Sequence, residues 1–133
     1  MEKIKLLLVD DDEILAFIFA NALNNKEINC EFISKPTAES GLEYLQETSD
    51  FPDIIFIDYK LPGKDGFDFL LEYEKQHFHE REALVFMISS SSKQEMAKAV
   101  QAFSFVEAFI EKPFAPQKLR ELIKYYFPKA VNV

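Results

Sequence analysis

Hydrophobic residues gather in five short runs along the chain, and amphipathic stretches separate them. The runs cover 4–9, 28–33, 53–57, 83–88 and 106–110. The first is almost continuous in Leu and Val, which is typical of a parallel strand buried on both faces. The second alternates hydrophobic and polar residues, which indicates an edge strand. The runs begin about 24 to 30 residues apart, enough for one strand and one crossover helix.

The stretches between these runs have the periodicity of helices. In the first and the last, hydrophobic residues recur three and four positions apart, at Ile14, Phe17, Ile18 and Ala22 and at Leu119, Leu122, Ile123 and Tyr126. Asp12 and Thr37 are suited to cap helices, and Pro116 suits the first turn of the last one. A further helix follows Gly66. The alternation of strand and helix predicts an α/β fold, a parallel sheet with helices on both faces.

Length and composition limit the class of protein. The chain has 133 residues without a linker, repeat or low-complexity tract, so we expect a single domain over 1–133 with no output domain. The net charge is −8 and no basic stripe is present, which disfavours nucleic acid and anionic membranes as partners. The single cysteine, Cys30, rules out an intramolecular disulfide. Because no signal peptide or membrane span is predicted, we expect a cytoplasmic protein.

Polar residues follow the hydrophobic runs at the points where strands are predicted to end. Asp10 and Asp11 follow the first run, Asp58 the third, Ser89 the fourth and Lys112 the fifth. In open parallel sheets, ligands bind at the carboxyl ends of the strands. We therefore expect three carboxylates, one hydroxyl and one ammonium group to meet in one crevice.

The chemistry of such a crevice is restricted. Three neighbouring carboxylates repel one another unless a cation neutralises them, and Mg²⁺ prefers carboxylates, water and phosphate oxygens. A lysine and a serine hydroxyl suit the oxygens of a phosphoryl group. A carboxylate beside bound magnesium can act as a nucleophile toward phosphorus and form an aspartyl-phosphate.

These positions resemble the signature of a known family. Val9-Asp10-Asp11, the segment IDYKLPGKDG around Asp58, MISS around Ser89 and Lys112-Pro113-Phe114 are similar to the signature positions of response regulator receiver domains. The resemblance covers essentially the whole chain, with four elements in order at strand ends. It implies a flavodoxin-like, doubly wound fold with five helices and a five-stranded parallel sheet in the order 2-1-3-4-5.

The resemblance also implies a role for each residue of the acidic pocket. Asp58 corresponds to the phosphoacceptor, and Mg²⁺ is the implied cofactor. Asp11 and Asp58 would bind the metal, Asp10 would do so largely through water, and Lys60 through its backbone carbonyl. The implied partners are a sensor histidine kinase and an unknown downstream protein or histidine phosphotransfer protein. The resemblance implies a phosphoacceptor signalling domain and not an enzyme, since such a domain catalyses only its own phosphorylation and dephosphorylation.

A second group of residues corresponds to the family's switch. Ser89 and Lys112 would hold phosphoryl oxygens, the Lys112–Pro113 peptide bond would be cis, and Phe109 occupies the position of an aromatic switch residue. The chain departs from the family's pattern in three places. Phe109 lacks the hydroxyl of the tyrosine often found there, 103–108 lacks the usual small Gly-Ala pair, and Lys60 puts a long cation near Asp58.

Two other classes of protein use a similar sheet. A magnesium-dependent phosphohydrolase of the haloacid dehalogenase type also has a strand-end aspartate nucleophile and a lysine. That family needs a second aspartate two residues after the nucleophile, where this chain has Lys60, and it usually carries a cap domain. A flavodoxin-like electron carrier needs a phosphate-binding loop after the first strand, where this chain is acidic. Both alternatives fit the sequence less well than a receiver domain.

Overall fold

A computed structural model describes residues 1–90 and 93–132 of the chain. Within them, five strands form one parallel sheet in the order β2-β1-β3-β4-β5. The strands are β1 (Ile4–Val9), β2 (Cys30–Lys35), β3 (Ile54–Asp58), β4 (Leu84–Ser89) and β5 (Val106–Glu111). The expected strand order is confirmed, and the second strand is an edge strand as predicted.

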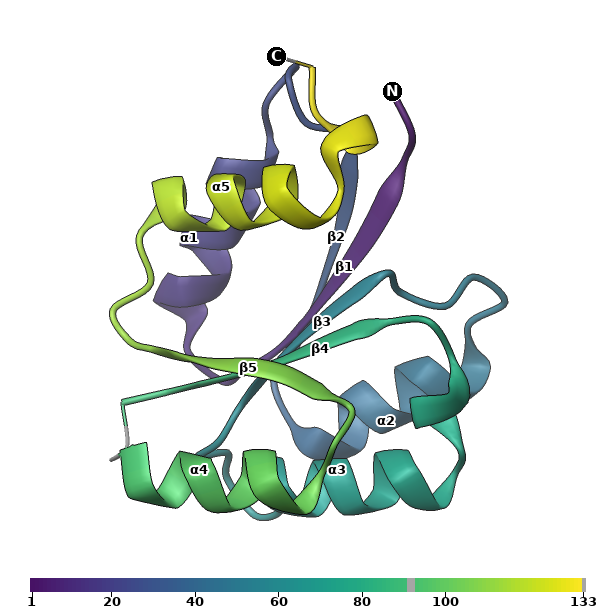
Figure 1. Ribbon diagram of the computed structural model, residues 1–133, viewed down its shortest axis with the longest axis vertical. Coiled ribbons are helices and arrows are strands. Elements are labelled where there is room, and N and C mark those ends of the chain that lie inside the picture. Colours follow the sequence, from purple (N-terminus) through teal and green to yellow (C-terminus); the bar gives the residue numbers. More distant parts are fainter. Residues whose placement is uncertain (91–92, 133) are drawn as a thin grey trace.

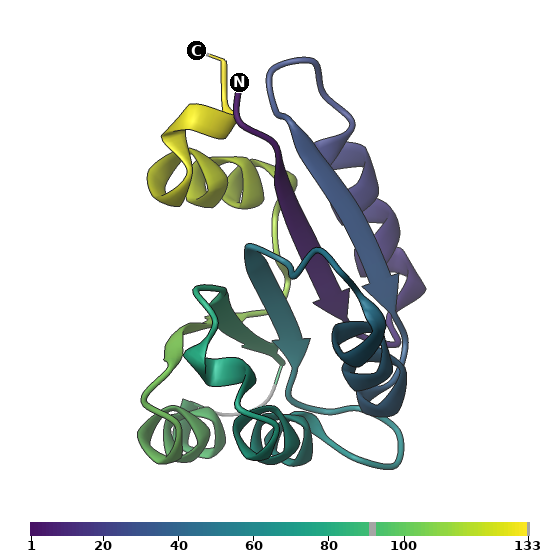
Figure 2. The same ribbon diagram turned by 90° about the vertical axis from the view of Figure 1, so that its right-hand side faces the viewer.

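The helices of the described residues cover both faces of the sheet. One face carries α1 (Glu13–Leu23) and α5 (Pro116–Tyr126), and the other carries α2 (Ala38–Glu47), α3 (Gly66–Lys75) and α4 (Lys93–Ala102) (Figures 1 and 2). Short 3₁₀ turns lie at Phe78–Glu80 and Pro128–Ala130. The doubly wound α/β fold predicted from the alternation of strands and helices is confirmed. None of the described helices is long and apolar enough to cross a bilayer.

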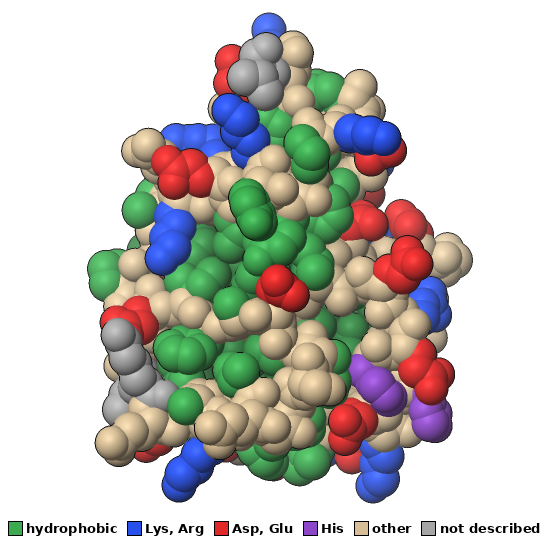
Figure 3. All heavy atoms as spheres, in the orientation of Figure 1, with side chains coloured by type: hydrophobic (Ala, Val, Ile, Leu, Met, Phe, Trp, Pro, Cys, Tyr) green, Lys and Arg blue, Asp and Glu red, His purple; other side chains and the backbone are tan. Residues whose placement is uncertain are grey.

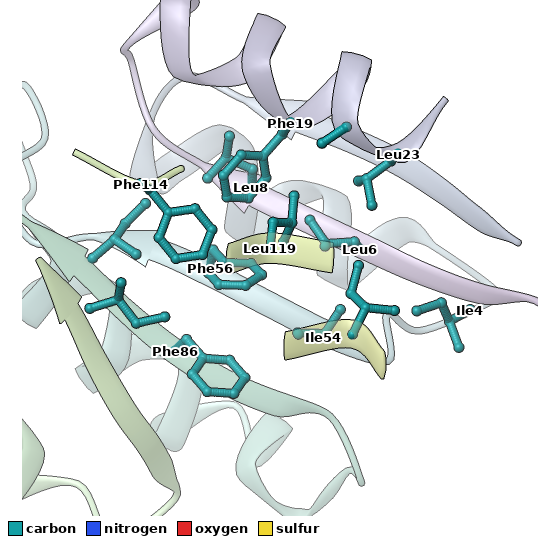
Figure 4. Close-up of a cluster of buried hydrophobic side chains, with 14 of the residues drawn as sticks. Ile4, Leu6, Leu8, Phe19, Leu23, Ile54, Phe56, Phe86, Phe114 and Leu119 are labelled. Atoms are coloured by element: carbon teal, nitrogen blue, oxygen red, sulfur yellow. The ribbon is translucent and has the colours of Figure 1, made fainter. Parts of the chain in front are cut away.

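The inner strands β1 and β3 are buried on both faces, so their side chains contribute to two separate cores. In β1, Leu6 and Leu8 pack toward α1 and α5, while Leu7 and Val9 pack toward α2 and α3. Phenylalanine fills much of the first core (Figure 4). The ring of Phe56 lies 5.3 Å from Phe19 in a T-shaped contact, 5.4 Å from Phe86 in a stacked one, and 5.8 Å from Phe114. Such ring pairs add to the free energy of burial.

The helix starts expected from the sequence are confirmed. The Asp12 carboxylate accepts hydrogen bonds from the backbone amides of Ile14 (3.0 Å) and Leu15 (3.2 Å). Thr37 caps α2 in a reciprocal capping box with Ser40, and Pro116 is the first residue of α5. These caps satisfy amides that a helix leaves without intrahelical partners.

The bounds of β2 differ from the prediction. The strand covers Cys30–Lys35 instead of 28–33, so it begins and ends two residues later. Ile28 is apolar and buried, as a strand residue would be. Its backbone, however, lies outside β2 and forms an isolated antiparallel bridge with Val131. At the other end, Lys35 pairs with Val9, which makes this polar residue part of the strand.

Aromatic residues occupy the turn into β5, at the place where the family that the sequence resembles usually has a small Gly-Ala pair. Phe103 is buried and its ring lies 5.1 Å from Phe67 of α3, and the Phe105 ring stacks 5.4 Å from Tyr73. The turn thus fastens the end of α4 to α3. On the face that carries β5 between α4 and α5, hydrophobic side chains gather at the surface (Figure 3).

Candidate functional site

The pairing of the strands brings the polar strand-end residues to one edge of the sheet. Asp58 is the last residue of β3 and lies opposite Ile88 of β4. Ser89 ends β4 opposite Glu111, and its carbonyl accepts a hydrogen bond of 3.0 Å from the backbone amide of Lys112. Asp10 follows β1 directly. Four of the five side chains that the sequence predicts to meet, those of Asp10, Asp11, Asp58 and Lys112, do come together there, and this cluster is called the crevice below.

Three carboxylates and one ammonium group form the centre of this crevice. Asp10, Asp11 and Asp58 each offer one oxygen, and these oxygens lie within 4.8 Å of one another. Asp10 and Asp58 are buried, with 3% and 5% of their surface exposed, while Asp11 is exposed to solvent. The Lys112 Nζ atom lies 3.0 Å from Oδ2 of Asp10 and 3.5 Å from Oδ2 of Asp58.

This environment changes the proton affinity of Asp58 and Lys112. Burial, strengthened by the charge of Asp10, raises the pKa of Asp58 to about 7, although Lys112 opposes the shift. For Lys112, burial alone would lower the pKa, but its contact with Asp10 and the nearby carboxylate charges outweigh burial and raise it. The single ammonium group therefore does not fully compensate the clustered acids, and the crevice favours a further cation.

The donor set fits a hard divalent ion. Carboxylate oxygens are ligands of Mg²⁺, and the exposed Asp11 leaves one side of the cluster open to water. Lys60, expected to contribute its backbone carbonyl, lies two residues after Asp58 in the loop to α3, with its side chain exposed. A hydrogen bond donated by the backbone N–H of Lys60 lowers the pKa of Asp58, so this amide, and not the carbonyl, is the group that lies beside the carboxylate.

The residues expected to form a switch lie beside this crevice. Ser89 is fully buried. Phe109 is half-buried opposite Met87 and packs with the core on the side of α2, α3 and α4. Because side chains alternate along a strand, Ser89 and Phe109 lie on the same face of the sheet, on neighbouring strands. The Lys112–Pro113 peptide bond is cis, the isomer expected from the sequence.

The structure gives Asp12 a contact that the sequence reasoning missed. While Oδ1 of Asp12 caps α1, its Oδ2 lies 3.8 Å from Nζ of Lys112. In addition, the backbone amide of Asp12 donates a hydrogen bond of 2.9 Å to Oδ1 of Asp10. The sequence does place Asp12 directly after Asp10 and Asp11. Its role as a helix cap accounts for an acid at this position, so only the tertiary structure reveals its second contact, with Lys112.

Comparison with known proteins places the chain in a family. A family model described as the response regulator receiver domain matches residues 6–124. The chain is 30% identical over 126 residues to hybrid signal transduction histidine kinase L of Dictyostelium discoideum, covering 92% of this chain and 7% of that protein. It is 28% identical over 129 residues to sporulation initiation phosphotransferase F of Bacillus subtilis, covering 96% and 97%.

Solved structures show the same fold. A two-component response regulator from Cytophaga hutchinsonii is 27% identical and superposes with a TM-score of 0.77, covering 96% of this chain and 99% of that one. A CheY-like receiver domain protein from Methanospirillum hungatei has a TM-score of 0.78 at 23% identity, covering 97% of both chains. The match over 6–124 and the shared fold show that this chain belongs to the family of response regulator receiver domains.

Proposed function

We propose that this receiver domain accepts a phosphoryl group on Asp58 from a sensor histidine kinase, in a reaction that depends on Mg²⁺. One observation carries the proposal: Asp58 ends a central strand beside two other carboxylates, with Lys112 Nζ 3.5 Å from its carboxylate. The domain would act as a signalling module that catalyses only its own phosphorylation and dephosphorylation. The relatives named a hybrid histidine kinase and a phosphotransferase support this class of partner.

The residues of the crevice would have three different roles in the phosphoryl transfer. An oxygen of Asp58 attacks the phosphorus of a phosphohistidine, the new P–O bond forms as the P–N bond breaks, and the imidazole leaves with its electron pair. Asp11, Asp58 and Asp10, with the Lys60 backbone carbonyl, would hold Mg²⁺, which would neutralise the carboxylates and the developing phosphoryl charge. Lys112 and Ser89 would bind phosphoryl oxygens.

A small phosphodonor tests the proposal without the kinase. With acetyl phosphate and Mg²⁺, the protein should gain the mass of one phosphoryl group, stable in acid and labile in base. Reduction with borohydride followed by peptide mass spectrometry should locate the group at Asp58, and chelation of Mg²⁺ should prevent labelling. Labelling at another residue, or undiminished labelling without metal, would contradict the proposal.

Phosphorylation then alters the surface through Ser89 and Phe109. New acceptor oxygens on Asp58 attract the Ser89 hydroxyl and the Lys112 ammonium group. Movement of Ser89 vacates space on the face it shares with Phe109, and the Phe109 ring follows. Since phenylalanine has no hydroxyl, packing alone stabilises the new position. A downstream protein or a histidine phosphotransfer protein reads this two-state change or receives the phosphoryl group.

Amide chemical shifts with and without beryllofluoride, a stable mimic of the phosphoryl group, test the switch. Changes should extend from the crevice to β5 and into α4, because Ser89 and Phe109 link these elements. Phe109→Ala should confine the changes to the crevice. Phe105→Ala is the matched control, because it removes a ring of the same size that stacks on Tyr73 of α3 and lies outside β5. Equal perturbations in the parent protein and the Phe109 variant would exclude Phe109 as the link.

A further inference from the structure

Gly66, the first residue of α3, lies against the backbone that carries Asp58. A Cβ atom at Gly66 would lie 2.6 Å from the carbonyl oxygen of Asp58 and 2.8 Å from Cα of Tyr59. Both are backbone atoms, and real Cβ atoms do not approach this closely. Among the described glycines, only Gly63 has a positive φ, of 76°, so the φ of Gly66 is not positive. Glycine is needed at 66 for space and not for an unusual backbone conformation.

The start of α3 is fixed, so the helix cannot easily retreat from this contact. Asp65 and Asp68 form a reciprocal capping box, with hydrogen bonds of 2.9 and 3.1 Å between side chain and backbone. The next turns of α3 bury Phe69, Leu70 and Tyr73 in the core. Moving the helix would disturb both the cap and this packing.

The backbone from Asp58 to Lys60, on the other side of this contact, is held by hydrogen bonds at only some of its residues. Asp58 is held in the sheet opposite Ile88, and the Tyr59 amide donates a hydrogen bond of 2.9 Å to the carbonyl of Ile88. The Tyr59 carbonyl accepts a bond of 2.8 Å from the Gly66 amide. Beyond it, Lys60 is exposed and the chain leaves the sheet. A side chain at 66 would therefore displace the peptides between Asp58 and Lys60.

We propose that Gly66 is a positioning residue for the phosphorylation site: its missing side chain lets α3 fix the Asp58–Lys60 backbone at the place where metal and phosphoryl oxygens are bound. This inference rests on the proposed function, because it assigns metal ligation to Asp58 and to the Lys60 carbonyl. It predicts that even one methyl group at 66 impairs the site while the core of α3 stays intact.

The test compares two glycine-to-alanine variants. In Gly66→Ala, the affinity for Mg²⁺ alone, measured by titration calorimetry, should fall by about 10- to 100-fold, the usual cost of disturbing the support of a metal site. Alanine favours a helix over glycine by up to about 1 kcal/mol, so this variant should fold. Gly41→Ala is the control, since a Cβ there would meet the side chains of Val9 (2.8 Å) and Phe69 (3.3 Å) and not the site's backbone.

The two variants distinguish positioning from stability. Urea unfolding of the metal-free proteins reports the stability that each variant loses, and amide shifts of Asp58, Tyr59 and Lys60 report local displacement. We expect Gly66→Ala to move these shifts and weaken Mg²⁺ binding, and Gly41→Ala to change only the unfolding midpoint. Parent-like Mg²⁺ affinity in Gly66→Ala, or equal weakening in both variants, would overturn the inference. A parent protein that binds no Mg²⁺ would instead contradict the proposed function itself.

Discussion

Asp58→Asn should abolish phosphorylation by acetyl phosphate, with the labelling rate falling by at least about a thousandfold, because removing a reaction's nucleophile has effects of this size or larger. The amide that replaces the carboxylate is isosteric but not nucleophilic. Because Asp58 lies in the crevice and not in either core, the fold should persist, which circular dichroism and a cooperative urea transition can verify.

The control for this experiment is another aspartate-to-asparagine change far from the crevice. Asp50 precedes β3, at the opposite end of the strand from Asp58, and its side chain is 80% exposed. Asp50→Asn should accept a phosphoryl group at the parental rate. If Asp58→Asn kept the parental labelling rate, the phosphoacceptor would have to be another residue, and the role given to this crevice would be wrong.

Burial patterns made the fold predictable from the sequence. The nearly continuous run at 4–9 suits a strand covered on both faces, and its Leu and Val residues do contribute to two cores. The shift of β2 shows the limit of this reasoning. Ile28 has the apolar character of a strand residue, but it owes its burial partly to a bridge with Val131, about a hundred residues later. Local periodicity contains no information on such a contact.

The candidate site was predictable to the extent that strand ends determine it. Asp10, Asp58 and Lys112 meet because parallel strands deliver their carboxyl ends to one edge. Gly66 was seen only as the marker of a helix start, since its closeness to the Asp58 carbonyl depends on how α3 packs. The second contact of Asp12 with Lys112 was missed for the same reason.

The second large effect concerns stability and pH. Burial and the charge of Asp10 raise the pKa of Asp58 from 3.8 to about 7 in the folded, metal-free protein. The folded state thus holds this proton more tightly than the unfolded chain. The contribution of Asp58 to stability is most favourable below about pH 4, where both states are protonated, and declines as the pH rises to about 7. Allowing for solvent screening, we expect a loss on the order of 2 kcal/mol.

Urea unfolding of the parent protein and of Asp58→Asn, both without metal, isolates this contribution. The two proteins should have similar stability near pH 4, and the variant should be the more stable one above about pH 7, because asparagine carries no charge to be buried beside Asp10. Mg²⁺ should then stabilise the parent at the higher pH by binding the ionised carboxylates, and it should stabilise the variant less. If the stability difference between the two proteins stayed constant with pH, Asp58 would ionise normally and the crevice would not hold the uncompensated charge that favours Mg²⁺.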